Sequence, residues 1–223
     1  MRTTFVSVAG LLLALTASAR AGNWPTWRGV AGDGVSNEKQ VPTSWSATEN
    51  ITWKSPLPGG GNSTPIVWGD SVFVTCASKQ GAVRSVICFD RATGTQRWSA
   101  DTQFKGVEPT HADNPYCASS PIADGKAVYA WLGSAGVVAY DLSGKPLWKG
   151  RAAGSTWGST VLADGRFFTT DQSGQTTVWS AGDALKIQSQ NPLNEKTRAT
   201  PVFSDGQIFI RTYENLYCIG KRK

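Results

Sequence analysis

One pattern recurs four times along the chain, and it constrains the fold more than any other feature of the sequence. Each copy holds a small residue that proline often follows, a short apolar run, a Gly/Asp turn and a second apolar run. The four copies are residues 63–74, 120–129, 159–168 and 200–210. The equivalent residues Asp124, Asp164 and Asp205 are 40 and 41 residues apart, whereas the first step, from Val72 to Val128, is 56 residues. Regular spacing of this kind indicates a repeat architecture, and the longer first step predicts an inserted loop.

Each repeat predicts a four-stranded antiparallel unit. Asp-Gly pairs between β-branched or aromatic runs are hairpin signals, because glycine tolerates the positive φ of a tight turn. A third run follows each hairpin, and in the first two units a fourth strand ends in Trp98 or Trp148. The run 72–74 does not alternate polar with apolar residues, which indicates a sheet that is covered on both faces. Radially stacked blades of a β-propeller meet that condition.

The two ends of the repeat region predict how the ring closes. The fourth unit, around Tyr217, lacks a fourth strand with tryptophan, whereas an isolated strand of that kind, residues 51–54, precedes the first unit. Pairing these two segments would remove two exposed sheet edges, which otherwise invite aggregation. The predicted fold class is therefore all-β, a propeller of about four four-stranded antiparallel blades in which the N-terminal strand completes the last blade.

The N-terminus is typical of a secretory signal peptide. Arg2 precedes an apolar run over residues 5–17, and Ala19-Arg20-Ala21 forms an A-x-A cleavage site. We therefore expect residues 1–21 to be a signal peptide and the mature chain, in the periplasm or outside the cell, to begin near Gly22. The apolar run is shorter than a membrane span requires. After the signal peptide, we expect an extended segment at 22–49, the propeller at 50–220 and a basic tail at 221–223.

The net charge of +6 does not indicate nucleic-acid binding. Five basic residues lie at the two ends of the chain, namely Arg2, Arg20, Lys221, Arg222 and Lys223. The rest of the chain carries 17 basic residues against 16 acidic ones. A basic stripe interleaved with aromatic residues, which a nucleic-acid surface needs, is missing from the sequence.

Several segments resemble one known family. Residues 23–29 (NWPTWRG), residues 51–59 (ITWKSPLPG) and the units that end in tryptophan look like the opening and the repeats of that family. It comprises bacterial exported proteins with pyrroloquinoline-quinone-type (PQQ-like) β-propeller repeats, similar in fold to the outer-membrane assembly factor BamB. Relatives usually have more blades, so this chain resembles a version shortened to about four, with the part up to Gly150 like a start and the part from Trp157 like an end. A closed ring, an open arc and a homodimer of open rings all remain alternatives.

The resemblance also raises the question of a quinone cofactor. Catalytic quinoproteins of this kind have adjacent cysteines and a calcium site beside an acidic base. The four cysteines here are not neighbours in the sequence: Cys76, Cys88, Cys117 and Cys218. Acidic residues with the spacing of a calcium loop do not occur either. We therefore expect no cofactor and no metal site. Cys76 and Cys88 fall on adjacent predicted strands, so a disulfide and buried free thiols are both compatible with the pattern.

Signatures of other catalytic sites are also weak, and we assign no catalytic residue. His111 is the only histidine, so a Ser-His-Asp type of triad would have to combine it with Asp113 or Glu108 in the longest irregular stretch. A surface histidine without such a role is the simpler interpretation. The repeated tryptophans, Trp53, Trp98 and Trp148, are expected to wedge between blades. The tryptophans outside the repeat positions are candidate contact residues: Trp24, Trp27, Trp45 and Trp157.

These observations favour an exported, non-catalytic β-propeller that acts as a binding or scaffolding module in the cell envelope. The expected partner is another protein or an envelope polysaccharide, and neither nucleic acid nor a transmembrane segment of the mature chain is expected. The alternative is an enzyme or sugar-binding protein with a site at the propeller axis, near the loop that bears His111. A shortened relic without a selected activity is a third hypothesis.

Overall fold

The computed structural model describes residues 22–220 except 109, 112 and 115, and this part of the chain is built from β-strands. The predicted signal peptide and the basic tail lie outside the described residues. Within the described part, no helix is long and apolar enough to cross a membrane.

The strands form three four-stranded sheets and one three-stranded sheet, each made of consecutive antiparallel strands. The first sheet holds β1 (Ile66–Trp68), β2 (Ser71–Ser78), β3 (Val83–Asp90) and β4 (Gln96–Gln103). The second holds β5 (Ile122–Ala123), β6 (Ala127–Trp131), β7 (Val137–Asp141) and β8 (Pro146–Gly150). The third holds β9 (Val161–Ala163), β10 (Arg166–Thr170), β11 (Gln175–Ser180) and β12 (Lys186–Pro192). The last holds β13 (Val202–Ser204), β14 (Gln207–Arg211) and β15 (Leu216–Ile219).

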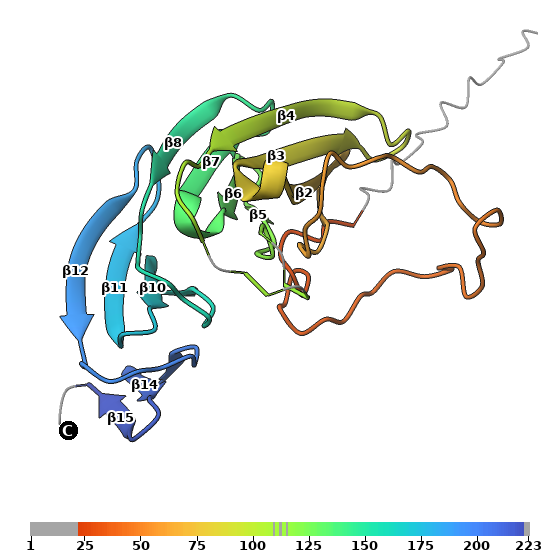
Figure 1. Ribbon diagram of the computed structural model, residues 1–223. Coiled ribbons are helices and arrows are strands. Elements are labelled where there is room, and N and C mark those ends of the chain that lie inside the picture. The colour runs from red at the N-terminus through yellow and green to blue at the C-terminus, as the bar shows by residue number, and fades with distance from the viewer. Residues whose placement is uncertain (1–21, 109, 112, 115, 221–223) are drawn as a thin grey trace, which may run out of the picture.

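The four sheets, called blades 1 to 4 below, follow one another along an arc (Figure 1). Blade 1 lies at the upper right of that view, and blade 4 lies at the lower left. The predicted all-β class, with antiparallel propeller-type blades, is confirmed. Two short 3₁₀ turns, Lys79–Gly81 and Gly133–Ala135, are the only helical elements among the described residues.

Two of the three Asp-Gly pairs in the repeats form the tight two-residue turns that the sequence predicts, whereas Asp124-Gly125 lies in a longer turn over residues 124–127. Asp164 and Gly165 have φ angles of 48° and 68°, and Asp205 and Gly206 have 46° and 73°. Two successive residues with positive φ are typical of a type I′ turn, whose twist matches that of the flanking strands. These turns set the register of the first two strands in blades 3 and 4, where Ala163 lies opposite Arg166 and Ser204 lies opposite Gln207.

Tryptophans at the predicted repeat position join neighbouring blades. Trp98 in β4 packs against Phe73 of its own blade and Tyr140 of blade 2, with ring centroids 5.9 and 6.0 Å apart. Its Nε1 donates a hydrogen bond of 3.1 Å to the Leu142 carbonyl, in the turn between β7 and β8. Trp148 in β8 repeats this contact, because its Nε1 donates to the Gly182 carbonyl of blade 3 at 2.8 Å. The predicted wedge role of these rings is confirmed.

The prediction that residues 51–54 complete the last blade is wrong. These residues belong to no strand of the described chain, and blade 4 has three strands. The Trp53 Nε1 instead donates to the Arg91 carbonyl at 2.9 Å, and its ring lies over Gly94, in the turn between β3 and β4 of blade 1. The physical reason is that the indole is anchored on blade 1, whereas the arc carries β15 to its other end (Figure 1).

The four cysteines of the described chain are free thiols. In the pairing of β2 with β3, Cys76 lies opposite Ser85 and Cys88 lies opposite Phe73. Positions 73 and 76 differ by an odd number, so Cys76 and Cys88 project from opposite faces of the sheet and a bridge between them is ruled out. Burial raises the pKa of the Cys76 and Cys88 thiols, and it raises the pKa of Cys117 to about 12.

We expect Trp98→Ala to lower the free energy of unfolding by about 3 kcal/mol, because the substitution leaves a cavity between blades 1 and 2. Trp98→Phe keeps most of the apolar contact and removes the indole donor, so a smaller loss of about 1 kcal/mol is expected. Urea denaturation followed by circular dichroism measures both values. Equal stability of the Ala variant and the parent chain would contradict the wedge role.

Asp90 closes the turn between β3 and β4, where its carboxylate accepts hydrogen bonds from Arg97 and Thr93. The Arg97 contact, followed by those of Thr93, lowers the pKa of Asp90 to about 2. A lowered pKa in the folded chain stabilises the fold above the unfolded pKa of about 3.9, and this contribution is lost as the pH falls towards 2. Asp90→Asn should therefore reduce the slope of unfolding free energy against pH between about 4 and 2. Asp183→Asn, in another exposed turn, is the control, and identical slopes for the parent and Asp90→Asn would contradict the assignment.

Candidate functional site

The loops that follow the second strand of each blade, and the fourth strand of blades 1 to 3, open on the same face of the arc, because antiparallel strands alternate in direction. This face, called the loop face below, is made by two sets of segments. The longer connections between blades are residues 104–121, 151–160 and 193–201, and the hairpins within blades are residues 79–82, 132–136, 171–174 and 212–215. The candidate residues His111 and Trp157 both lie on these segments, so the loop face is where a binding site is expected.

A buried ion pair fixes the first of these loops. Arg84 in β3 is 1% exposed, and its Nη2 lies 2.5 Å from Oε2 of Glu108 in the loop. Its Nη1 and Nε donate to the Leu132 and Gly81 carbonyls at 2.6 and 3.1 Å. The other Glu108 oxygen accepts the Ser134 amide at 3.2 Å. Arg84 therefore connects blade 1, the inserted loop and blade 2.

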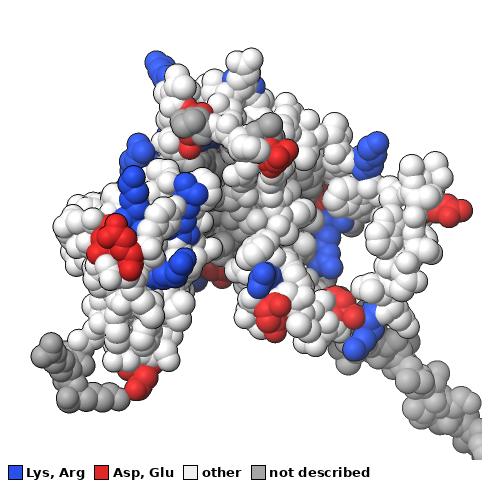
Figure 2. All heavy atoms as spheres, turned by 60° about the horizontal axis from the view of Figure 1, so that its bottom comes forward, with Lys and Arg blue, Asp and Glu red and all other residues white. Residues whose placement is uncertain are grey.

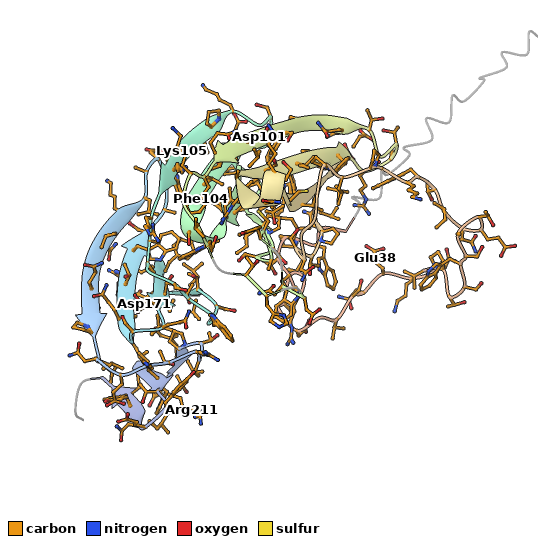
Figure 3. All side chains as sticks on the ribbon, in the orientation of Figure 1. Glu38, Asp101, Phe104, Lys105, Asp171 and Arg211 are labelled. Carbon is orange, nitrogen blue, oxygen red and sulfur yellow. The ribbon has the colours of Figure 1, made fainter. Side chains whose placement is uncertain are left out.

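Two aromatic rings enclose the same guanidinium. Its carbon lies 4.5 Å from the ring centroid of Phe104 and 5.0 Å from that of Tyr116, both within the range of cation–π attraction. Figure 3 shows Phe104 and Lys105 where the chain leaves blade 1. Arg84 therefore holds the loop in place through its ion pair with Glu108 and its contacts with the rings of Phe104 and Tyr116.

His111 does not form a catalytic group with Glu108. Its side chain is 76% exposed, and its Nδ1 lies 3.5 Å from Oδ2 of Asp113, which is 91% exposed. Glu108 is engaged by the buried Arg84, so the triad with Glu108 is not assembled. Within the described ranges, no three His, Cys, Asp or Glu side chains are grouped so as to hold a metal ion.

The four tryptophans outside the repeat positions differ in their surroundings. Trp24 pairs through its backbone with Val67, and its ring lies beside Gly29, so it has a structural role. Trp27 and Trp45 are 56% and 69% exposed on the N-terminal segment. Trp157 is 66% exposed and lies on the loop face. The structure therefore does not bring these four rings together into one site.

The structure places two further residues beside Trp157. The guanidinium carbon of Arg198 lies 3.9 Å from the Trp157 ring centroid and 6.0 Å from that of Tyr213, which is 57% exposed. We call these three residues the aromatic–arginine platform. Sequence reasoning missed Arg198 and Tyr213, since neither occupies a repeat position and each is on a different segment. Figure 2 shows basic side chains gathered at the left, over the part of the arc that holds blades 3 and 4.

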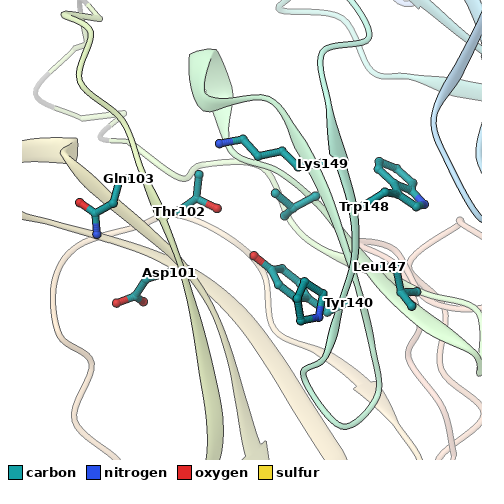
Figure 4. A pocket seen from close by; sticks show the side chains of 9 residues that line it. Asp101, Thr102, Gln103, Tyr140, Leu147, Trp148 and Lys149 are labelled. Carbon is teal, nitrogen blue, oxygen red and sulfur yellow. The ribbon is translucent and has the colours of Figure 1, made fainter.

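An outer groove of about 420 Å³ runs between blades 1 and 2 (Figure 4). Asp101, Thr102 and Gln103 of β4 line one side, and Leu147, Trp148 and Lys149 of β8 line the other. Tyr140 lies between them in the close-up view. The groove is the space between two neighbouring blades and offers polar contacts of both charges. The platform, which has two exposed rings and a cation, is the better candidate for recognition of a partner.

We expect Glu108→Ala to lower the free energy of unfolding by about 3 kcal/mol, because it leaves the Arg84 guanidinium buried without its counter-charge. The double variant Arg84→Met with Glu108→Leu removes both charges and should lose less stability than Glu108→Ala. Urea denaturation of the parent and both variants measures the difference. A double variant that is at least as unstable as the single one would show that the ion pair is not what fixes the loop.

The match to one family model supports the fold. The family model described as outer membrane protein assembly factor BamB matches residues 35–154 and 133–219. None of the curated proteins matches the sequence significantly. The crystal structure of BamB from Moraxella catarrhalis is 15% identical with a TM-score of 0.46, and the match covers 73% of this chain. This chain spans 46% of that BamB chain, which is less than half of its length.

Two other solved structures are similar in part. A europium-containing methanol dehydrogenase is 14% identical with a TM-score of 0.48, over 79% of this chain and 31% of the dehydrogenase chain. The computationally designed Ika4 protein is 12% identical with a TM-score of 0.45, over 72% of this chain and 94% of the Ika4 chain. The family match covers most of the described residues and agrees with the tryptophan contacts between antiparallel blades. The chain therefore belongs to the family of PQQ-like β-propeller repeat proteins whose model is described as outer membrane protein assembly factor BamB.

Proposed function

We propose that this protein is an exported, non-catalytic binding or scaffolding module of the cell envelope, and that its partner is another protein. The family model, described as an outer-membrane assembly factor, supports an envelope role. The signal-peptide pattern of residues 1–21 supports export to the periplasm or beyond.

The aromatic–arginine platform is the observation that carries the proposal. Trp157 comes from the loop before β9, Arg198 from the loop before β13, and Tyr213 from the hairpin between β14 and β15. Tryptophan, tyrosine and arginine are the residue types that most often dominate the binding energy of protein interfaces. The two large rings are exposed, so a partner that covers them would bury apolar area and meet a cation at the same place.

An envelope polysaccharide is the second candidate partner, because the exposed Trp157 ring beside Arg198 also suits a sugar that carries a carboxylate. The rings form the stacking surface in this case, and the guanidinium pairs with the carboxylate in a bidentate manner. An enzyme with a site near His111 is less well supported, since His111 is exposed and Glu108 is already paired with Arg84.

Site-specific photo-crosslinking in intact cells tests the proposal. A benzoylphenylalanine at position 157 should give adducts with an envelope protein, and the same probe at exposed position 92, in the turn between β3 and β4 on the opposite face, should not. Arg198→Ala should reduce the adduct yield at position 157 several-fold.

Three outcomes would contradict this proposal. Glycan-array binding of the purified chain that is lost in Trp157→Ala and kept in Trp27→Ala would favour the polysaccharide. Oxidation of an alcohol or sugar by the purified chain with added pyrroloquinoline quinone would show that the module is catalytic. Equal crosslinking at positions 157 and 92 would argue against the platform as the binding surface.

A further inference from the structure

The three tryptophans of the repeat position make the same contact with the turn between the third and fourth strands of the next blade. Trp98 donates to Leu142 in blade 2, and Trp148 donates to Gly182 in blade 3. Trp53 donates to Arg91 in the corresponding turn of blade 1. Trp53 therefore occupies the place of a fourth-strand tryptophan from a blade that precedes blade 1. Its own segment, residues 51–54, is not part of any sheet in the described chain.

Among the described residues, blade 4 lacks a fourth strand, and β15 is its edge strand. The Thr212 amide donates to the Asn215 carbonyl at the hairpin between β14 and β15. From this pair onward, hydrogen-bonded and non-hydrogen-bonded residue pairs alternate along the two antiparallel strands. The amides of Leu216 and Cys218 therefore point away from β14, towards the edge of the sheet that no described strand covers. Glu195 holds this hairpin in place, since it accepts hydrogen bonds from Thr212, Asn215 and the Tyr217 hydroxyl. A fixed strand with outward amides is a template for a further strand.

The register of that further strand follows from the other blades. In blade 1, Cys88 lies between Phe73 on β2 and Trp98 on β4. In blade 2, Ala139 lies between Tyr129 on β6 and Trp148 on β8. An aromatic residue, a small residue and a tryptophan thus lie side by side across three strands.

Blade 4 repeats the first two members of this row, with Phe209 opposite Cys218. The two phenylalanines occupy equivalent positions in their blades. In blade 4, Ser204 and Gln207 form the pair next to the first hairpin turn, and Phe209 comes two residues after Gln207. In blade 1, Trp68 and Ser71 form that pair, and Phe73 comes two residues after Ser71. The missing third member of the row is a tryptophan opposite Cys218. Trp53 has the required side chain, and residues 51–54 around it are a segment that no sheet of the described chain uses.

One chain cannot supply both contacts while its arc is as observed. Trp53 is held on blade 1, and β15 lies at the opposite end of the arc (Figure 1). We propose that β15 of one copy pairs with residues 51–54 of a second copy, with Trp53 opposite Cys218, so that two arcs close into one ring with two identical junctions. Each junction joins β15 of one copy to residues 51–54 of the other. A two-fold rotation generates the second junction from the first, so that β15 is paired in both copies. This surface is distinct from the aromatic–arginine platform, so the inference does not depend on the proposed function.

Mass measurement by light scattering tests the two-copy ring. The exported, purified chain should have twice the mass of one chain and dissociate on dilution. Cys218→Pro removes the outward amide at the edge, and it should raise the dissociation constant of the dimer by at least about tenfold. Cys218→Ser keeps that amide and is the matched control, which should dimerise like the parent. A monomer at all concentrations, or a filament, would overturn the two-copy ring.

A disulfide trap tests the register and does not depend on the stability of a proline variant. With Trp53 opposite Cys218, Thr52 lies opposite Ile219 in a non-hydrogen-bonded pair, where the Cβ atoms are closest. Thr52→Cys with Ile219→Cys, in a Cys218→Ser background, should give a covalent dimer on mild oxidation. Each single cysteine should give at least about tenfold less covalent dimer. A disulfide within one chain would show that the chain closes on itself, and no enrichment over the single cysteines would show that the segments do not pair. Either result would overturn the proposal.

Discussion

The contact between a fourth-strand tryptophan and a turn of the next blade is the interaction on which the rest of this structure depends. Hydrogen bonds between strands hold each sheet together, but neighbouring sheets share no strand. The indole buries a large apolar surface between two blades and satisfies a turn carbonyl, so it fixes both the distance and the orientation of the next blade. Trp53, Trp98 and Trp148 repeat this contact along the first three blades.

The junction between blades 3 and 4 is made differently, and the aromatic–arginine platform lies across it. In β12, Ser189 lies opposite Val178, at the position where blades 1 and 2 have tryptophan. Phe168 packs on Phe203 with ring centroids 4.7 Å apart, and the Ser159 amide donates to the Thr200 hydroxyl at 2.9 Å. Arg198, between the rings of Trp157 and Tyr213, adds a contact between the two blades on the loop face. A partner that binds there would stabilise the junction that lacks the tryptophan.

Residues on the loop face could be predicted only in part. The sequence singled out His111 because it is the only histidine, and Trp157 because it is outside the repeat positions. Trp157 lies at the candidate site, whereas His111 is exposed and Glu108 is paired with Arg84. Arg198 could not be found from the sequence, since an arginine in a loop has no pattern that indicates which ring it will contact. Contacts of this kind depend on how two loops, distant in the sequence, are placed by the sheets beneath them.

The sequence by itself determined the blades. Alternating short apolar runs and Gly/Asp turns are local signals, and strands, hairpins and the spacing of the tryptophans follow from them. Only the tertiary structure decided that the four sheets form an arc, that Trp53 contacts blade 1, and that β15 is the edge strand of blade 4 within the described part of the chain. The physical reason is that ring closure depends on the angle between blades, which side-chain packing sets at every junction and which accumulates along the chain. A local sequence pattern therefore does not predict the total rotation from the first blade to the last.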